Sequence, residues 1–283
     1  MLDANRLLNW TIPEIRQTYT AKDTILYALG IGFGGRVDDR DELRYVYEKE
    51  LRVAPSMALV LGYPGFWLKE VDAGFDWRKV LHGEQTVRVF NPLPTAATVI
   101  GRTRVVAIYD KGPGRDAVLV NERDVIDAAS GELLSKLSAT LVLRGASGFG
   151  GPPTPAAPVD ELPEGCPDAV ASLSTSVQSA LIYRLSGDMN PLHADPEVAA
   201  AAGFPRPILH GLCTLGTAMR AVAKATGLEI DTLTEFGACF SAPVFPGETI
   251  SAEVWHGAGR GRFQCRVLER DKAVLTRGFF TAR

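Results

Sequence analysis

The residues best suited to acid–base chemistry lie in the segment Asp188-Met-Asn190-Pro-Leu-His193. A carboxylate and an imidazole that converge on one point can take a proton from water and deliver one to a neighbouring atom. His193 follows Asp188 by five positions, which is not the spacing of one helix face, and Pro191 interrupts them. A turn at Asn190-Pro191 would bring both side chains to the same side. The pattern suits reversible addition of water to an activated double bond.

Such an addition places negative charge on the carbonyl oxygen conjugated with the double bond, and that oxygen needs hydrogen-bond donors. We expect Gly211 to supply one, because it opens a predicted helix that runs from about His210 to Thr226 and stops at Gly227. Its N–H therefore has no acceptor within the helix and lies at the positive end of the helix dipole. A glycine also lets a ligand approach closely. If the substrate is a thioester, no metal is required.

Two predicted helices hold the segment that carries Asp188 and His193. The first begins with a capping-box pattern at Thr175 and Gln178 and ends at Ser186-Gly187. The second begins at Asp195, whose side chain is a good N-cap. The acid–base residues are therefore expected on a loop fixed at both ends.

A change in composition between Gly145 and Pro167 divides the chain, because this stretch is rich in Gly and Pro and has no hydrophobic period. It predicts an N-terminal half (1–148), a linker (149–167) and a C-terminal half (168–283). The two halves align weakly, with Tyr27 over Tyr183 and Gly32 over Asp188. Because glycine replaces the carboxylate, we expect a single active site per chain, in the C-terminal half.

Long alternating segments end each half and predict antiparallel strands with one buried face, hence an α+β fold. They are 97–110, 116–127 and 133–145 in the N-terminal half, and 248–257, 262–271 and 273–283 in the C-terminal half. The N-terminal counterpart of the long helix, 54–62, should stop after two turns because Gly62-Tyr-Pro-Gly65 follows. We expect the missing turns to leave room for a ligand tail.

The bulk composition is that of a globular protein, with 46% hydrophobic and 22% charged residues and a net charge of −3. It does not favour a nucleic-acid partner. The four cysteines lack metal-ligand spacing, so no metal is expected. The glycines of 30–35 satisfy a dinucleotide-binding pattern but follow a helix-like segment, which excludes that interpretation. Without a signal peptide or an apolar run long enough to span a membrane, we expect a cytoplasmic protein.

Two motifs resemble the hydratase 2 (MaoC-like) family, which includes the (R)-specific 2-enoyl-CoA hydratases. They are Tyr183-Arg-Leu-Ser-Gly-Asp188-Met-Asn190-Pro-Leu-His193 and the Gly203–Thr214 segment with Pro-Ile-Leu-His-Gly-Leu-Cys-Thr. The resemblance covers the whole chain, including Leu81-His-Gly-Glu-Gln85. It implies a double hot-dog fold, with two repeats that are each an antiparallel sheet wrapped around a central helix. The N-terminal repeat would bind the acyl tail and the C-terminal repeat would carry catalysis.

The resemblance also assigns roles within the site. Asp188 and His193 would hold the catalytic water, Asn190 would position the loop, and the amide of Gly211 would polarise the thioester carbonyl. The residues expected to contact substrate are Tyr183, Pro207, His210 and Met57. Tyr183 suits a core role equally well. No metal and no cofactor are implied, since CoA is part of the substrate.

The leading hypothesis is therefore (R)-specific hydration of trans-2-enoyl-CoA to (3R)-3-hydroxyacyl-CoA. A related dehydratase acting on acyl-carrier-protein thioesters, or on short branched or dicarboxylic CoA esters, is a second possibility. Thioester hydrolysis is a third, because hot-dog proteins include thioesterases. A non-catalytic acyl-CoA binding module would not need the Asp–Asn–His set. We expect a homodimer. His82 is interpreted as structural and His256 as solvated.

Overall fold

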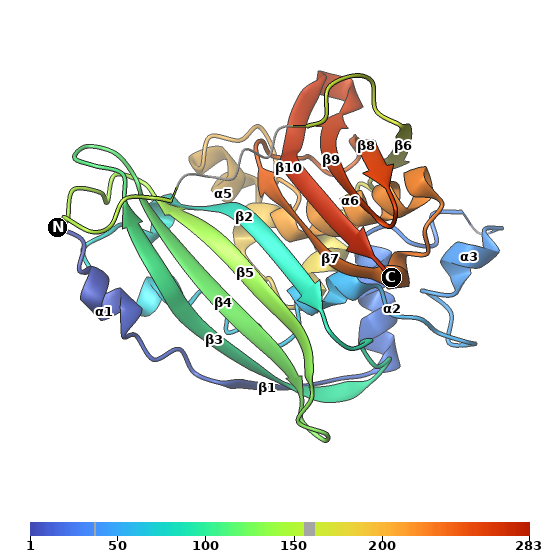
Figure 1. Ribbon diagram of the computed structural model, residues 1–283, viewed down its shortest axis with the longest axis horizontal. Coiled ribbons are helices and arrows are strands. Elements are labelled where there is room, and N and C mark those ends of the chain that lie inside the picture. The colour runs from blue at the N-terminus through green and yellow to red at the C-terminus, as the bar shows by residue number, and fades with distance from the viewer. Residues whose placement is uncertain (37, 156–161) are drawn as a thin grey trace.

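Alternating apolar residues of the two halves form two antiparallel sheets that join edge to edge. The computed structural model describes residues 1–36, 38–155 and 162–283. Ten strands form one sheet in the order β1-β3-β4-β5-β2-β7-β10-β9-β8-β6. The first five strands in this order belong to the N-terminal half and the last five to the C-terminal half. In Figure 1 the strands of the two halves stand on opposite sides of the view.

Each predicted alternating segment contains a strand, although 262–271 ends in the 3₁₀-helix η7 (Leu268–Arg270), and four further strands join them. The N-terminal strands are β1 (Ile15–Tyr19), β2 (Val80–Val89), β3 (Ala97–Asp110), β4 (Ala117–Asp127) and β5 (Leu133–Leu143). The C-terminal strands are β6 (Ala169–Ser174), β7 (Leu233–Phe240), β8 (Thr249–Gly257), β9 (Arg260–Val267) and β10 (Lys272–Ala282). Sequence alternation had not identified β1, β2, β6 or β7.

Strands β2 and β7 form the join between the halves. They pair antiparallel with Gln85 opposite Ala238 and Val87 opposite Phe236. Val87 and Phe236 are fully buried. One hydrophobic core runs across this join and includes residues of both halves. The halves therefore share their interior as well as their sheet.

The C-terminal sheet wraps around α6 (Gly211–Thr226), which lies behind its strands in Figure 1. The helix has the expected bounds, and Gly227 ends it in the left-handed conformation, with φ of 70°. Cys213 and every position from Leu215 to Ala223 are buried. The other α-helices are α1 (Ala4–Leu8), α2 (Ala21–Gly30), α3 (Arg40–Leu43), α4 (Ser179–Tyr183) and α5 (Pro196–Ala201). No helix in the described ranges is both long and apolar enough to cross a membrane.

The N-terminal sheet has only a short central element, as expected. This element is the 3₁₀-helix η1 (Pro55–Leu59). The chain turns away at Gly62, whose φ is 59° and whose backbone passes so close to β3 that an added Cβ would lie 2.6 Å from the Cα of Gly101. The double hot-dog arrangement is confirmed. The N-terminal repeat departs from it because no long helix fills its centre.

The duplicated helices α2 and α4 pack against each other. The rings of Tyr27 and Tyr183, which occupy matching positions in the two halves, are 5.8 Å apart. Beside Gly32, where the C-terminal half has Asp188, lies the buried side chain of Arg220. It donates to the carbonyl of Ile31 at 2.9 Å and forms an ion pair with Glu42. The guanidinium of Arg220, on α6, therefore occupies the position in the N-terminal half that corresponds to the acid–base pair of the C-terminal half.

The linker is attached to both halves. Residues 156–161, within the predicted 149–167, lie outside the described residues. Before them, the carboxylate of Asp110 accepts bonds from the amides of Gly148 and Gly150, both at 2.8 Å. After them, the indole N–H of Trp255 donates to the carbonyl of Gly165 at 3.4 Å.

Candidate active site

The loop from Gly187 to His193 is built from local turns. Helix α4 continues into the 3₁₀-helix η4 (Arg184–Ser186), and Gly187 ends it with φ of 132°. The carboxylate of Asp188 then accepts from the amide of Asn190 at 3.2 Å. The side chain of Asn190 caps the 3₁₀-helix η5 (Pro191–His193) by accepting from Leu192 N at 3.1 Å. Asn190 thus has the expected positioning geometry, because each short bond fixes the next residue.

The capping box predicted for Thr175 and Gln178 is wrong. Gln178 is the N-cap of α4, and no side chain caps that helix. The hydroxyl of Thr175 instead donates to the carbonyl of Glu248 at 2.9 Å and accepts from Gly247 N, also at 2.9 Å. A tertiary partner therefore takes the group that the local pattern assigned to the helix. The N-cap at Asp195 is confirmed, since its side chain accepts from Glu197 N at 2.8 Å.

The turn at Asn190-Pro191 brings Asp188 and His193 together, and His210 joins them. One nitrogen or carboxylate oxygen from each of these three residues lies within 4.8 Å of the other two. Sequence spacing predicted the Asp188–His193 convergence. The position of His210 in the same cluster comes from the start of α6, where it is the N-cap residue.

His193 is held in the form that a base requires. Its Nδ1 lies 2.9 Å from the carbonyl of Ile208, and because a carbonyl only accepts, Nδ1 must carry the proton and donate. Nε2 therefore keeps a free lone pair. Burial lowers the pKa of His193, although the Ile208 carbonyl and Asp188 oppose that shift. The ring is consequently neutral at neutral pH and able to accept a proton.

His210 packs against the ring of His193 and helps to hold it in place. Its ring stacks on that of His193 with centroids 3.7 Å apart, and its Nε2 lies 3.1 Å from the carbonyl of Asp188. Burial and the adjacent His193 lower the pKa of His210 to about 4. Its Nδ1 is buried without a hydrogen-bond partner. Two neutral rings therefore pack where two charged ones would repel each other.

Gly211 lies where the sequence placed it, at the first position of α6. Its amide belongs to the first helical turn, which has no acceptors within the helix; the first bond of α6 to a preceding carbonyl runs from Thr214 N to His210 O at 2.9 Å. Gly211 faces the same cavity as Asp188 and His193. An oxyanion can therefore meet its N–H near the acid–base pair.

The cavity has a volume of about 500 Å³ and is lined by both halves. In the N-terminal half it reaches the space beyond η1, where its lining residues include Leu59, Val60, Leu68, Leu137 and Leu141. This is the space that the curtailed helix was predicted to leave. A volume in this range suits a small-molecule ligand with an apolar tail.

Three residues expected to contact substrate, Tyr183, Met57 and Pro207, differ in whether they line the cavity. Tyr183 lines the cavity but is only 1% exposed, and it packs beneath His210 with ring centroids 5.0 Å apart. Met57 is buried in the core at 2% exposure and is not among the lining residues. Pro207 is not among the lining residues either, whereas the next residue, Ile208, is. Met57 and Pro207 therefore do not line this cavity, and their contact with substrate stays a prediction.

Sequence reasoning missed one histidine of the site. His82, on β2, lines the cavity, and its ring lies 4.9 Å from that of Phe240 beside Gly211. Its Nε2 lies 3.1 Å from the carbonyl of Glu84, and burial lowers its pKa to about 4. The Leu81–Gln85 motif was noticed, but only the β2–β7 pairing shows that it approaches the C-terminal site. His256 is exposed on the β8–β9 hairpin, as expected.

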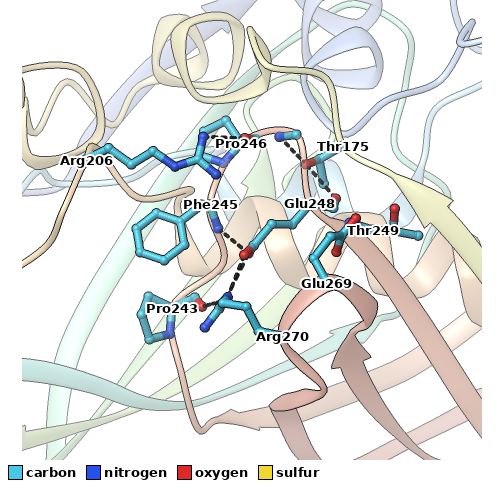
Figure 2. A network of polar contacts seen from close by, with 10 residues as sticks. Thr175, Arg206, Pro243, Phe245, Pro246, Glu248, Thr249, Glu269 and Arg270 are labelled. Atoms are coloured by element: carbon cyan, nitrogen blue, oxygen red, sulfur yellow. Dashed lines mark hydrogen bonds and ion pairs between the residues drawn. The ribbon is translucent and has the colours of Figure 1, made fainter.

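A polar network stabilises the cavity wall formed by residues 240–244 (Figure 2). The buried carboxylate of Glu248 accepts from Phe245 N at 2.7 Å and pairs with Arg270. Arg270 also donates to the carbonyl of Pro243 at 2.8 Å. The Phe245 ring lies 5.1 Å from the guanidinium carbons of both Arg270 and Arg206. The wall is therefore held from outside the cavity, and Val244 in turn accepts from Leu209 N at 2.7 Å.

The Asp188–His193–His210 cluster also has the separations of a cation site. Its geometry suits proton transfer better. The ring planes of His193 and His210 are inclined by only 26°, and the lone pair of each imidazole lies in its ring plane. The lone pairs of stacked rings lie in nearly parallel planes, whereas the lone pairs of ligands to one ion must converge on it.

Comparison with known proteins places the chain among hydratases and dehydratases. Family models described as "MaoC like domain" and "MFE-2 hydratase 2 N-terminal domain" match residues 159–277 and 17–145, respectively. "Enoyl-CoA hydratase 2, peroxisomal" of Arabidopsis thaliana is 38% identical over 96% of this chain and 93% of that protein. "3-hydroxyacyl-thioester dehydratase Y" of Mycobacterium tuberculosis is 41% identical over 96% and 94%, respectively. A MaoC-like dehydratase structure from Phytophthora capsici is 32% identical, with a TM-score of 0.86 and coverage of 100% of this chain and 99% of that one.

Proposed function

Because the chain belongs to the MaoC-like hydratase 2 family, we propose that it interconverts trans-2-enoyl-CoA and (3R)-3-hydroxyacyl-CoA. One relative is named for hydration and another for dehydration, and these are the two directions of one reaction. The protein is an enzyme of the hydro-lyase class. The observation that carries this proposal is the convergence of Asp188 and His193 beside the free amide of Gly211 in one cavity.

The acid–base step uses the free lone pair of His193. In the hydration direction, Nε2 accepts a proton from a water molecule that the carboxylate of Asp188 also binds. The water oxygen forms a bond to C3 of the substrate, and the π electrons of the C2–C3 bond move toward the thioester carbonyl. C2 then takes a proton back from the Asp188–His193 pair, which returns to its starting state. A positioned base of this kind contributes about 10²–10⁴-fold to the rate.

The carbonyl oxygen becomes negative when the π electrons shift. The amide of Gly211 would donate to that oxygen, and the first-turn dipole of α6 would stabilise its charge. Because the amide is part of the helix, it needs no reorganisation as charge develops. This role requires neither a metal nor a cofactor, and we propose that none takes part.

The acyl tail would extend into the N-terminal half. The cavity continues there past η1, between apolar side chains of β5 and the segment that follows η1. CoA as the carrier is supported by the names of the relatives. The homodimer and the cytoplasmic location stay predictions, and the Arabidopsis relative is named as peroxisomal.

A turnover assay across enoyl-CoA lengths tests the proposal. Loss of the conjugated enoyl thioester is followed in time, and the product is analysed for chirality. We expect (3R)-3-hydroxyacyl-CoA, and we expect Asp188→Asn and His193→Ala to abolish its formation. His256→Ala is the matched control, because this histidine is exposed on a hairpin away from the cavity.

A thiol reagent in the same assay separates hydration from thioester hydrolysis. Hydration releases no free CoA, whereas hydrolysis releases one thiol for each substrate consumed. Thiol release without a hydroxyacyl product, or full activity in the Asp188→Asn, His193→Ala double variant, would overturn the proposal.

A further inference from the structure

The part of the cavity that lies in the N-terminal half, here called the acyl arm, contains a buried cation. Arg123, on β4, lines the cavity and is 8% exposed. Its Nη2 donates to the carbonyl of Leu59 at 2.6 Å, and its guanidinium carbon lies 5.4 Å from the centre of the Tyr63 ring. No carboxylate in the described parts of the chain forms an ion pair with it. A purely hydrocarbon tail would not require this residue.

The hydrogen-bonding capacity of Arg123 is not used up. Its Nε is buried without a hydrogen-bond partner. Thr103, directly opposite on β3, also lines the cavity, and its hydroxyl is likewise buried and unpartnered. Because opposite residues of an antiparallel pair share one face of the sheet, the two groups are neighbours. Asn121, two positions before Arg123, lines the same face.

The charge of Arg123 persists despite burial. Burial lowers its pKa to about 10, which still leaves the guanidinium protonated at neutral pH. An unpaired buried charge costs stability, and chains normally pair such a charge or avoid it. A guanidinium is the side chain best shaped to bind a carboxylate. The positive charge in the acyl arm is therefore without an anionic partner among the described residues until a ligand carboxylate binds there.

The cationic position is near the acid–base pair. Tyr63 lines the same cavity as Asp188, and its ring centre lies 5.4 Å from the guanidinium carbon of Arg123. Because the whole cavity has a volume of about 500 Å³, an acyl chain running from Asp188 past Tyr63 would reach Arg123 within a short length. The walls around it, Leu137 and Leu141, are apolar.

We propose that the preferred substrates are short enoyl-CoA thioesters whose acyl chain ends in a carboxylate, bound by Arg123 with Thr103. This inference rests on the proposed hydration of enoyl-CoA. It adds that the N-terminal half selects the far end of the acyl chain by charge. Arg123 is then a specificity residue that takes no part in proton transfer.

The test compares two substrates of equal chain length, one ending in a methyl group and one in a carboxylate. The unmodified enzyme should show the higher kcat/KM for the carboxylate. In Arg123→Met, a neutral residue of similar length, the carboxylate-to-methyl ratio should fall by about 10–100-fold, the loss expected for a hydrogen bond to a charged group. Arg123→Lys should recover part of that ratio. Arg104→Met is the matched control, since Arg104 pairs with Glu122 and Asp124 at the surface of the same sheet.

The outcomes separate this inference from the function on which it rests. If neither substrate is hydrated by the unmodified enzyme, the proposed function itself fails. If both are hydrated with equal kcat/KM, only the role of Arg123 is overturned. An equal loss for both substrates in Arg123→Met would mean that the residue serves only to bind the Leu59 carbonyl. The ratio in the unmodified enzyme decides the matter even if the variant does not fold.

Discussion

The imidazole of His193 stacks on that of His210, and each ring is held by a hydrogen bond from a different ring nitrogen. His193 uses Nδ1 toward Ile208, and His210 uses Nε2 toward the carbonyl of Asp188. Neither ring can flip without losing its hydrogen bond. The orientation of the proposed base therefore depends on the start of α6 as well as on its own loop.

The first prediction concerns the pH dependence of turnover. Burial lowers the pKa of His193, so the neutral ring persists to lower pH than an ordinary histidine with a pKa of about 6.5. We expect kcat/KM to stay level as the pH falls through 6.5 and to decline only in more acid solution. An acid limb centred at or above about 6.5 would contradict this assignment of the base.

The second prediction concerns stability in acid. The pKa of His210 and that of His82 are both lowered to about 4, so the unfolded chain binds protons at these positions more readily than the folded chain does. The contribution of these two histidines to the free energy of unfolding should therefore be complete above pH ~6.5. The free energy of unfolding should fall as the pH drops from there toward 4. Urea unfolding at several pH values measures this slope. His82→Gln should reduce the slope.

The third prediction isolates the amide of Gly211. Proline is well tolerated at the first position of a helix, and His210, with φ of −59° and ψ of 135°, has a backbone compatible with a following proline. Gly211→Pro should therefore fold while lacking the N–H, and kcat should fall by about 10²–10³-fold.

Gly211→Ala is the control, because it keeps the N–H. Its Cβ would lie 3.3 Å from the Phe240 ring, so that ring must shift slightly. We expect a much smaller loss than in Gly211→Pro. Equal losses in the two variants would indicate that bulk at this position, and not the donor, limits turnover.

The fourth prediction concerns the network behind the cavity wall. Burial opposes the ionised form of Glu248, but the bonds from Arg270 and Phe245 outweigh it, and its pKa is lowered. Glu248→Gln should reduce the free energy of unfolding by about 1.5–3 kcal/mol, and the difference should shrink as the carboxyl protonates in acid. Glu269→Gln is the matched control, since that carboxylate is exposed and accepts from the amide of Thr249 at 2.9 Å.

The fifth prediction concerns metal dependence. If Asp188, His193 and His210 act through protons, dialysis against a strong chelator should leave kcat and KM unchanged. The measurement is the turnover assay before and after chelation, with divalent zinc or magnesium added back in parallel. Activity that disappears with the chelator and returns with one cation would assign the cluster to metal binding.

Local signals in the sequence predicted the elements that depend on local physics. The periodic apolar stripe and Gly227 gave the bounds of α6, and Pro191 indicated the turn that joins Asp188 to His193. Tertiary choices were not predictable in this way. The hydroxyl of Thr175 bonds to Glu248 far along the chain, and Met57 is buried in the core shared by the two halves. His82 reaches the site only through pairing between the halves.

The pairing of β2 with β7 has a consequence for the linker. Main-chain bonds and a shared core already set how the two halves align, so the covalent connection need not do so. The halves can be regarded as two subunits of a dimer that happen to be translated as one polypeptide. A single polypeptide holds them at a fixed one-to-one ratio, and neither half has to be complementary to a copy of itself.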